Sequence, residues 1–466
     1  MSAEEIANAT NGRLSGNSKH VIDSISTDSR NISNGELFVA LEGDSFDGHE
    51  FVEQALSQGA AGAVVKKGFK MTDSMRQQSL FVEVDDTLIA YQDVAAYNRL
   101  KSNAVVVAIT GSSGKTTTKE MVRAILSVGK QSALISEKNF NNHVGVPMTL
   151  LKINKDHGVA VLEVGINQIN EMDRLANITN PDIALVTNAG CSHLEFLKNV
   201  DTVAFEKMKI ANGLKEDGTL IINYDDLRLL RHSRTKLVKS ITYGFSKSAD
   251  IVGSDFEDVD LNHSRLTVNR YDMPTQTIEL KVNGKHNAYN ALAAISVAHA
   301  LNIPTDEIVT GLSAFTSKDM RNESIMLKDD ILLINDAYNA NPDSMEAALT
   351  LLKSLQGAKR RIAVLGDMYE LGAYSERAHK EVGAKVAGLN IDHLFLYGPE
   401  MRNAAKSAGI CGMDKKCIHW FDNLDLMLGD LLALIEPGDW IMIKGSRANK
   451  LEKVADKLIN TIGIKR

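Results

Sequence analysis

Short apolar runs alternate with helix-length amphipathic segments along most of the chain. The runs that predict strands are Val105–Thr110, Val159–Val164, Asp182–Thr187, Ile331–Asn335, Ile362–Leu365, Leu394–Tyr397 and Trp440–Ile443. Helical periodicity occupies segments between and after them, among these Thr116–Val128, Ser344–Leu355, Ser375–Leu389 and Asn449–Ile459. Continuously apolar strands separated by helices are typical of parallel sheets that helices cover on both faces. The pattern therefore predicts an α/β protein.

Changes in this alternation of predicted strands and helices divide the chain into three predicted domains. Residues 1–102 carry mixed short strands and turns and predict a small mixed α/β domain. Residues 103–315 begin with a strong strand–loop–helix unit, although residues 239–285 are β-rich with hairpin signals. The polar stretch 316–324 precedes a fresh strand, so residues 316–466 form the third domain. Its alternating strands and helices predict a doubly wound, Rossmann-like fold.

Composition narrows the class of protein. A chain of 466 residues, 44% hydrophobic and 24% charged, is an ordinary globular protein of two to four domains. The net charge of −7 argues against a non-specific nucleic-acid binder. The three cysteines, Cys191, Cys411 and Cys417, include no CxxC pair and predict neither a disulfide framework nor a structural zinc site. We expect a cytoplasmic protein without a signal peptide or membrane partner.

A glycine-rich loop between a strand and a helix is the strongest chemical signal. The segment VVVAITGSSGKTTTK places small residues where backbone N–H groups can face phosphate oxygens at a helix N-terminus. Lys115 would reach the β- and γ-phosphates, and the Thr116 hydroxyl would bind Mg²⁺. Ile109 stands where the usual motif has its first glycine, and the alternative is an ordinary strand-to-helix turn. The predicted ATP-binding residues are Gly111, Ser112, Ser113, Gly114, Lys115, Thr116 and Thr117.

Three further residues in the central domain could serve the same site. Glu163 ends a predicted strand, His193 follows another, and Lys207 lies on a predicted helix. Ligands of open α/β sheets collect at the carboxyl ends of strands, where a glutamate and a histidine could hold Mg²⁺. Taken singly, each residue has a simpler interpretation: a turn-capping glutamate, a surface histidine and a solvated lysine.

These segments together resemble the Mur ligases of bacterial cell-wall synthesis, from about residue 27 to about residue 450. TGSSGKTTTKE resembles the short phosphate loop of the family, and residues 139–147 match its N-x-N-N-x-x-G-x-P segment, with Asn141 and Asn142 near the UDP-sugar. Glu163 and His193 match the metal-binding positions, so the resemblance implies two Mg²⁺ ions. Lys207 aligns with the lysine that the family carries as an N-carbamate, which is an oxygen ligand. Lys209 stands where the family often has an acidic residue.

The resemblance extends to the nucleotide contacts of the second and third domains. Asn287 and Asn290 match asparagines beside the adenine, and Arg321 matches an arginine that reaches the nucleotide. The run DAYNANP supplies Asp336 for ATP and Asn339 and Asn341 for substrate. GDMYELG at 366–372 and KGSR at 444–447 end two other strands of the third domain. Read alone, KGSR is either a solvated basic turn or a strand end that faces a carboxylate or phosphate.

The first domain indicates which branch of the family is involved. Residues 26–30 and 46–49 resemble a uridine-binding domain that two of the four amino-acid-adding branches share. Without this resemblance, the same residues would be interpreted as polar turns. The residues implied in substrate binding are Ser29, Arg30, Asp47, Gly48 and His49. The D-N-P-R segment of relatives that add diaminopimelate is absent from the sequence. The resemblance thus implies a monomeric, ATP-dependent ligase of peptidoglycan synthesis that joins D-alanyl-D-alanine to UDP-N-acetylmuramoyl-tripeptide through an acyl phosphate.

Three other functions share parts of this pattern. A folylpolyglutamate synthase shares the second and third domains but lacks a uridine-binding first domain. An amidotransferase subunit acting on lipid-linked precursor usually has a cysteine zinc ribbon, which three scattered cysteines cannot form. A non-catalytic ATP-binding scaffold would not need Glu163, His193 and Lys207 together. For the ligase, three substrates on three domains imply a hinge closure that brings Arg321 and the Asp336 segment over ATP.

Overall fold

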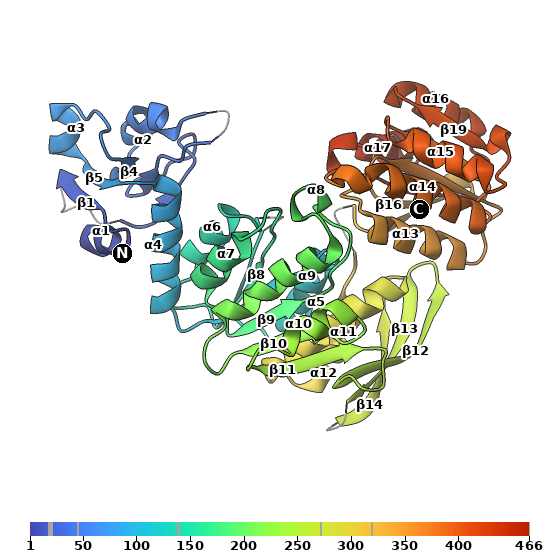
Figure 1. Ribbon diagram of the computed structural model, residues 1–466, viewed down its shortest axis with the longest axis horizontal. Helices are drawn as coiled ribbons and strands as arrows, with labels where there is room; N and C mark the ends of the chain where they lie inside the picture. The colour runs from blue at the N-terminus through green and yellow to red at the C-terminus, as the bar shows by residue number, and fades with distance from the viewer. Residues whose placement is uncertain (17–21, 44–45, 138–139, 271–272, 318–319, 466) are drawn as a thin grey trace.

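The computed structural model describes residues 1–16, 22–43, 46–137, 140–270, 273–317 and 320–465. Its strands form three sheets, one in each predicted domain, and the first and third domains lie at opposite ends of the long axis (Figure 1). This arrangement confirms the predicted α/β class with three parts. The predicted boundaries fall between secondary-structure elements, and their positions at 102 and 315 stay predictions.

The first domain is a five-stranded sheet in the order β1-β5-β4-β3-β2, parallel except for β1. Successive strand residues face opposite sides. Leu80 and Val82 thus pack under the helices α1 and α4, whereas Phe81 packs under α2. The elements are β1 (Arg13–Gly16), β2 (Ile25–Ser26), β3 (Leu37–Val39), β4 (Gly62–Lys66), β5 (Leu80–Val84), α1 (Ala3–Ala9), η1 (Gly48–Phe51), α2 (Val52–Ser57), α3 (Asp73–Gln78) and α4 (Thr87–Lys101).

Helix α4 lies between the first and second domains (Figure 1). Near its end, the Arg99 side chain is only 1% exposed. Its guanidinium donates to the carbonyls of Thr179, Asn180 and Ala104 and pairs with the Asp182 carboxylate at 2.7 Å. These contacts anchor α4 to the amino-terminal edge of the central sheet, because Asp182 directly precedes strand β9.

The central domain is a nine-stranded sheet in the order β14-β13-β12-β11-β10-β9-β6-β8-β7. Val107 and Ile109 of β6 face α5, α11 and α12, whereas Val106 and Ala108 face α6, α7 and α9. Antiparallel strands β12, β13 and β14 extend the sheet and confirm the predicted hairpins. The strands are β6 (Val105–Thr110), β7 (Ala133–Ile135), β8 (Val159–Glu163), β9 (Ile183–Val186), β10 (Thr219–Asn223), β11 (Lys239–Gly244), β12 (Ile251–Asp260), β13 (His263–Arg270) and β14 (Met273–Leu280). The helices are α5 (Lys115–Val128), α6 (Gly145–Leu151), α7 (Glu171–Thr179), α8 (Leu194–Leu197), α9 (Val200–Met208), η2 (Lys209–Gly213), α10 (Leu227–Ser233), α11 (Lys285–Ala300) and α12 (Thr305–Ala314).

The third domain is a six-stranded sheet in the order β15-β16-β20-β17-β18-β19, parallel except for the edge strand β15. Apolar clusters on both faces confirm the doubly wound prediction. The strands are β15 (Glu323–Met326), β16 (Leu332–Asp336), β17 (Arg360–Gly366), β18 (His393–Tyr397), β19 (Ile418–Phe421) and β20 (Asp439–Lys444). The helices are η3 (Lys328–Asp330), α13 (Pro342–Ser354), η4 (Gly372–Tyr374), α14 (Ser375–Gly388), α15 (Met401–Ile410), η5 (Lys415–Cys417), α16 (Leu424–Leu434), η6 (Arg447–Asn449) and α17 (Glu452–Ile462).

One predicted helix begins later than its periodicity suggests. The periodicity predicts a helix over residues 449–459, but α17 runs from Glu452 to Ile462. Lys450 has a φ of 55°, in the left-handed region, and Asn449 donates its side-chain N–H to the Asp367 carbonyl at 2.7 Å. This tertiary contact holds the chain out of helical geometry for one turn. Among the described residues, no helix combines the length and apolar character that crossing a membrane requires.

Candidate active site

A cavity of about 1240 Å³ lies between the central and third domains. The carboxyl ends of β6, β8, β9 and β10 form one side, and the loop between β16 and α13 forms another. This is the edge where ligands of open α/β sheets bind. The structure brings most of the predicted site residues to this cavity: Ser112, Ser113, Gly114, Lys115, Thr116, Thr117, Asn141, Asn142, Glu163, His193, Asn287, Asn290, Arg321, Asp336, Asn339 and Asn341.

The phosphate loop is held in shape by contacts from the loop after β9. Gly111 and Gly114 have backbone φ values of 146° and 81°, which residues that carry a Cβ rarely adopt. A Cβ at Gly111 would lie 1.8 Å from the Thr187 hydroxyl oxygen. The Ser113 N–H donates to Asn188 Oδ1 at 2.9 Å, and Asn188 Nδ2 donates back to the Ser113 carbonyl at 3.1 Å. The strand, loop and helix predicted from the sequence are thus present.

Glu163 gathers polar groups beside this loop. Its side chain is 2% exposed; Oε2 accepts from the Thr116 hydroxyl, and Oε1 accepts from Asn141 Nδ2, both at 2.7 Å. Lys115 Nζ donates to the Gly111 carbonyl at 2.8 Å. Burial lowers the pKa of Lys115, and the negative charge of Glu163 opposes that shift. A hydroxyl and a carboxylate at hydrogen-bond distance form a set of oxygen donors that fits Mg²⁺.

His193 is placed at the boundary between two domains. It immediately precedes α8 and has a φ of 54°. Its Nδ1–H donates to the carboxylate of Glu370, which lies in the loop between β17 and η4 of the third domain. This hydrogen bond lowers the pKa of Glu370. Glu370 lines the cavity but was not singled out from the sequence, because nothing in GDMYELG marks one acidic residue over the other.

Lys207 lies on helix α9, as predicted, but in the interior. Its side chain is 1% exposed and is not among the residues that line the cavity. Burial, followed by the positive charge of Lys115, lowers the pKa of Lys207 well below its usual value. Within the described part of the chain, no carboxylate pairs with it. Lys209, the departure from the family pattern, pairs with Asp173 and Glu206 at 2.9 Å each, so its charge is neutralised locally.

The start of helix α11 carries the predicted adenine contacts. Asn287 and Asn290 are both buried, and Asn290 Nδ2 donates to Asn287 Oδ1 at 3.1 Å. Asn287 Nδ2 in turn donates to the Asn283 carbonyl at 2.8 Å. A Cβ at Gly114 would lie 2.2 Å from Asn290 Oδ1, so the phosphate loop and α11 are in close contact.

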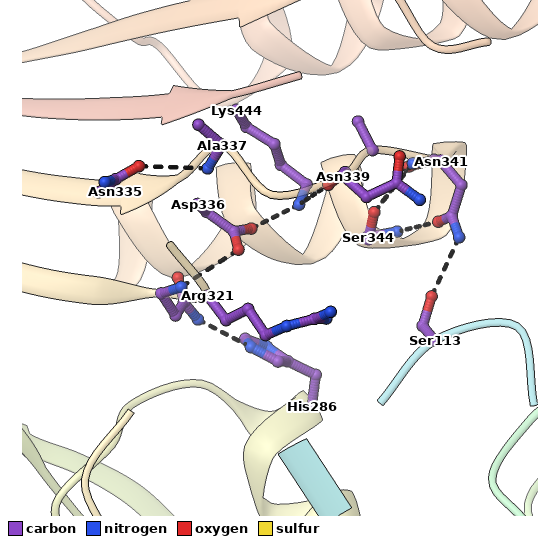
Figure 2. A network of polar contacts seen from close by, with 12 residues as sticks. Ser113, His286, Arg321, Asn335, Asp336, Ala337, Asn339, Asn341, Ser344 and Lys444 are labelled. Carbon is purple, nitrogen blue, oxygen red and sulfur yellow. Dashed lines mark hydrogen bonds and ion pairs between the residues drawn. The ribbon is translucent and has the colours of Figure 1, made fainter. Parts of the chain in front are cut away.

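The third domain presents a polar network to the cavity (Figure 2). Asp336 pairs with Lys444, whose Nζ also donates to the Asn339 carbonyl at 3.1 Å. The Arg321 guanidinium lies 3.8 Å from the centroid of the Tyr338 ring. KGSR therefore contributes one buried lysine to the site rather than a wholly solvated turn.

Asn341 joins this network to the central domain. Its Nδ2 donates to the hydroxyl of Ser113 in the phosphate loop at 3.1 Å (Figure 2). Its Oδ1 accepts from the Ser344 N–H at 2.8 Å and caps helix α13. Arg321 and Asp336, which the closure hypothesis brings over ATP, already line the same cavity as the phosphate loop.

The predicted uridine-binding residues do not line this cavity. Ser29, Arg30, Asp47, Gly48 and His49 all belong to the first domain. His49 Nδ1 bonds to Asp47 Oδ1 at 2.6 Å, and His49 Nε2 accepts from the Lys66 N–H at 2.9 Å, so both ring nitrogens are used within the domain. Arg30 forms a two-pronged pair with Asp28 at 2.8 and 2.9 Å. Asn139 of the N-x-N-N segment lies outside the described residues.

Several lining residues were missed by sequence reasoning. Asp225 follows strand β10 and accepts from the Tyr289 hydroxyl at 2.8 Å. Asp226 accepts from the Ala189 N–H at 2.8 Å and caps helix α10. The strand TLIIN before them is as apolar as those that were recognised, so the rule that strand ends carry ligands could have found this pair.

Three family models match the chain in order. They are the Mur ligase family catalytic domain at residues 21–107, the Mur ligase middle domain at 109–298 and the Mur ligase glutamate ligase domain at 320–447. The UDP-N-acetylmuramoyl-tripeptide–D-alanyl-D-alanine ligase of Bacillus subtilis (strain 168) is 36% identical over 95% of this chain and 94% of its own. The ligase of the same name from Escherichia coli (strain K12) is 34% identical over 98% of each chain.

Solved structures agree with these matches. A crystal structure of MurF from Acinetobacter baumannii superposes with a TM-score of 0.89 at 31% identity and covers 99% of both chains. MurF ligase from Thermotoga maritima in complex with ADP gives a TM-score of 0.83 at 26% identity over 94% of this chain and 97% of its own. Folylpolyglutamate synthase of Mycobacterium tuberculosis, at 17% identity and a TM-score of 0.63 over 81% of this chain and 95% of its own, shares the fold alone. On this sequence and structural evidence, the chain belongs to the Mur ligase family.

Proposed function

We propose that the chain joins D-alanyl-D-alanine to UDP-N-acetylmuramoyl-tripeptide and converts ATP to ADP and phosphate. One observation carries the proposal: a single cavity holds the phosphate loop, Glu163 and the third-domain segment 336–341. A site of this kind can place a nucleotide, an acceptor and an incoming amine together. Relatives that carry this activity in their names match nearly the full length of the chain, which supports the choice of substrates.

The proposed reaction proceeds in two steps. The terminal carboxylate of the tripeptide attacks the γ-phosphate of ATP, so an acyl phosphate forms and ADP leaves. The amine of D-alanyl-D-alanine then attacks the acyl carbon, loses a proton and releases phosphate. A carboxylate that approaches a polyanion needs compensating positive charge, which Lys115 and the N-terminus of α5 supply. No covalent enzyme intermediate is needed.

We further propose that Thr116 and Glu163 hold one Mg²⁺ ion and that His193 and an N-carbamate on Lys207 hold a second. When bound, these ions would neutralise charge that develops on the transferring phosphoryl group. Three of the four proposed ligands fit this role: the Thr116 hydroxyl and the Glu163 carboxylate converge at 2.7 Å, and His193 lines the same cavity, whereas Lys207 is buried outside the cavity lining.

Lys207 has the properties that carbamate formation requires. Only a neutral amine adds to CO₂, giving an N-bound carboxylate and releasing a proton. Burial favours the neutral amine of Lys207 because it lowers the pKa of this side chain. ¹³C NMR of the protein in ¹³C-bicarbonate should show a carbamate signal that is lost in Lys207→Ala. A small added carboxylate should restore part of the turnover of that variant.

Each of the three domains is proposed to supply a different group of the remaining substrate contacts. Ser29, Arg30, Asp47, Gly48 and His49 of the first domain (1–102) are proposed for the uridine moiety, where His49 orients Asp47. In the central domain (103–315), Asn141 and Asn142 face the sugar, and Asn287 and Asn290 face the adenine. In the third domain (316–466), Arg321 and Asp336 bind ATP, and Asn339 and Asn341 bind substrate. The protein is proposed to act as a monomer in the cytoplasm.

Phosphate release in Mg-ATP tests this function. UDP-N-acetylmuramoyl-tripeptide would be supplied with D-alanyl-D-alanine, with single D-alanine or with L-glutamate. The proposal expects amine-dependent release with D-alanyl-D-alanine alone, with a product of the added dipeptide mass. Release with L-glutamate instead would move the assignment to another branch of the family.

A further inference from the structure

We infer that Glu370 is a positioning residue for metal binding: it crosses from the third domain to fix the ring of His193 so that Nε2 faces the metal. The inference rests on the proposed function, because it takes His193 as a metal ligand. It adds a residue from a different domain, and it makes the second metal site depend on the position of that domain.

The hydrogen bond selects one ring nitrogen. His193 Nδ1 donates to the Glu370 carboxylate, which can only accept, so the proton is on Nδ1. In the neutral ring, Nε2 then carries the lone pair, and no hydrogen bond to it is made by the part of the chain that the structure describes. Histidines that bind metals usually donate their other N–H to a carboxylate or carbonyl, which fixes the tautomer and the orientation of the ring. The His193–Glu370 pair has this arrangement.

Both His193 and Glu370 have a strained backbone conformation. His193 and Glu370 have φ values of 54° and 61°, in the left-handed region that residues other than glycine rarely adopt. Such conformations persist where the surrounding contacts over-determine them, and they cluster at functional sites. Here the Glu195 N–H donates to the Glu370 carbonyl at 3.0 Å. The backbone of Glu370 is thus fixed by the residue two places after His193, independently of the side-chain contact.

The surfaces around the pair fit closely. A Cβ at Gly372 would lie 2.9 Å from the Cα of Glu195, so only a glycine allows this approach between η4 and α8. A second contact lies nearby, where the Cys191 N–H donates to the Asp343 carboxylate at 2.6 Å. The central and third domains therefore contact each other closely around His193. Displacing the third domain would remove Glu370 and free the imidazole to rotate, so metal affinity should report on docking of that domain.

Mn²⁺ titration followed by electron paramagnetic resonance tests the inference. The full-length protein would be compared with Glu370→Gln, Glu370→Asp and His193→Ala in bicarbonate buffer with saturating ADP. Glu376→Gln is the matched control, because Glu376 lies in the same domain and its one ion pair within the described residues is with Lys380, at 2.5 Å. Two classes of Mn²⁺ site are expected in the wild type, one of which is lost in His193→Ala. Glu370→Gln should weaken that class by about 10- to 100-fold.

Further readouts separate positioning from a merely structural role. ADP affinity in EDTA should be unchanged in Glu370→Gln, and excess Mg²⁺ should restore its turnover, which a folding defect would not allow. Glu370→Asp should recover part of the Mn²⁺ affinity, and Glu376→Gln should match the wild type. Wild-type Mn²⁺ affinity in Glu370→Gln, or in His193→Ala, would overturn the inference. Failure of the proposed function is seen separately, as absence of D-alanyl-D-alanine-dependent phosphate release by the wild type.

Discussion

Gly114, the residue before helix α5, can be used to test whether the phosphate loop and the predicted adenine contacts act as one unit. It has a φ of 81°, and a Cβ there would lie 2.2 Å from Asn290 Oδ1. In Gly114→Ala, the left-handed backbone costs about 1–2 kcal/mol. The methyl group also displaces Asn290, whose hydrogen bond to Asn287 is worth about 1 kcal/mol. We expect a total loss of about 2–3 kcal/mol of folding stability.

Gly412→Ala is the matched control. Gly412 has a φ of 99°, and a Cβ there would meet no atom within 4 Å, so the variant carries the backbone strain without the clash. Urea denaturation should show a loss of about 1–2 kcal/mol in Gly412→Ala and a larger loss in Gly114→Ala. Isothermal titration calorimetry should show ADP affinity about tenfold weaker in Gly114→Ala alone, because the methyl group would displace Asn290 from its proposed contact with the adenine. Equal stabilities and unchanged ADP affinity would refute the proposed coupling.

Three further predictions address stability, the domain contact and pH. Arg99→Met should lower the free energy of unfolding, measured by urea denaturation, by about 3–5 kcal/mol, because it leaves buried acceptors unpaired. The KM for ATP, measured by steady-state kinetics, should stay unchanged. Asn341→Asp keeps the oxygen that caps α13 but loses the N–H donor to Ser113 and adds negative charge, so the KM for ATP should rise about tenfold or more with an unchanged Tm. Burial lowers the pKa of His393 and His419 below 6.5, so the unfolded chain binds more protons and stability should fall as the pH drops below that value. Replacing both histidines by Gln should flatten this decline between pH 7 and 5, measured by urea denaturation; an equally steep decline would contradict it.

The central strands and the phosphate loop could be predicted because local patterns determine them. Val105–Thr110 is a strand with the predicted bounds, since a continuously apolar run is stable only between two helical layers. The start of α17 could not be predicted, because the Asn449 contact with the Asp367 carbonyl comes from a distant part of the chain. Helix periodicity contains no information about such contacts.

The candidate site was predictable where residues follow strands or belong to a recognised motif. Glu163 and His193 were found in this way, and the structure places both at the cavity. Glu370 and Asn188 were missed because their importance lies in the partners they meet, His193 and Ser113, which are far away in sequence. The burial of Lys207 could not be predicted from the sequence either, since a lysine on a short helix is usually solvated.

Transfer of oxygen from acceptor to phosphate tests the account most directly. UDP-N-acetylmuramoyl-tripeptide with ¹⁸O at both oxygens of the terminal carboxylate would be incubated with the protein, Mg-ATP and D-alanyl-D-alanine, and the products analysed by mass spectrometry. The account predicts that one ¹⁸O atom appears in each phosphate released, together with a pentapeptide product that retains the other. Unlabelled phosphate would contradict the acyl phosphate, and labelled phosphate without the pentapeptide would contradict the proposed amine.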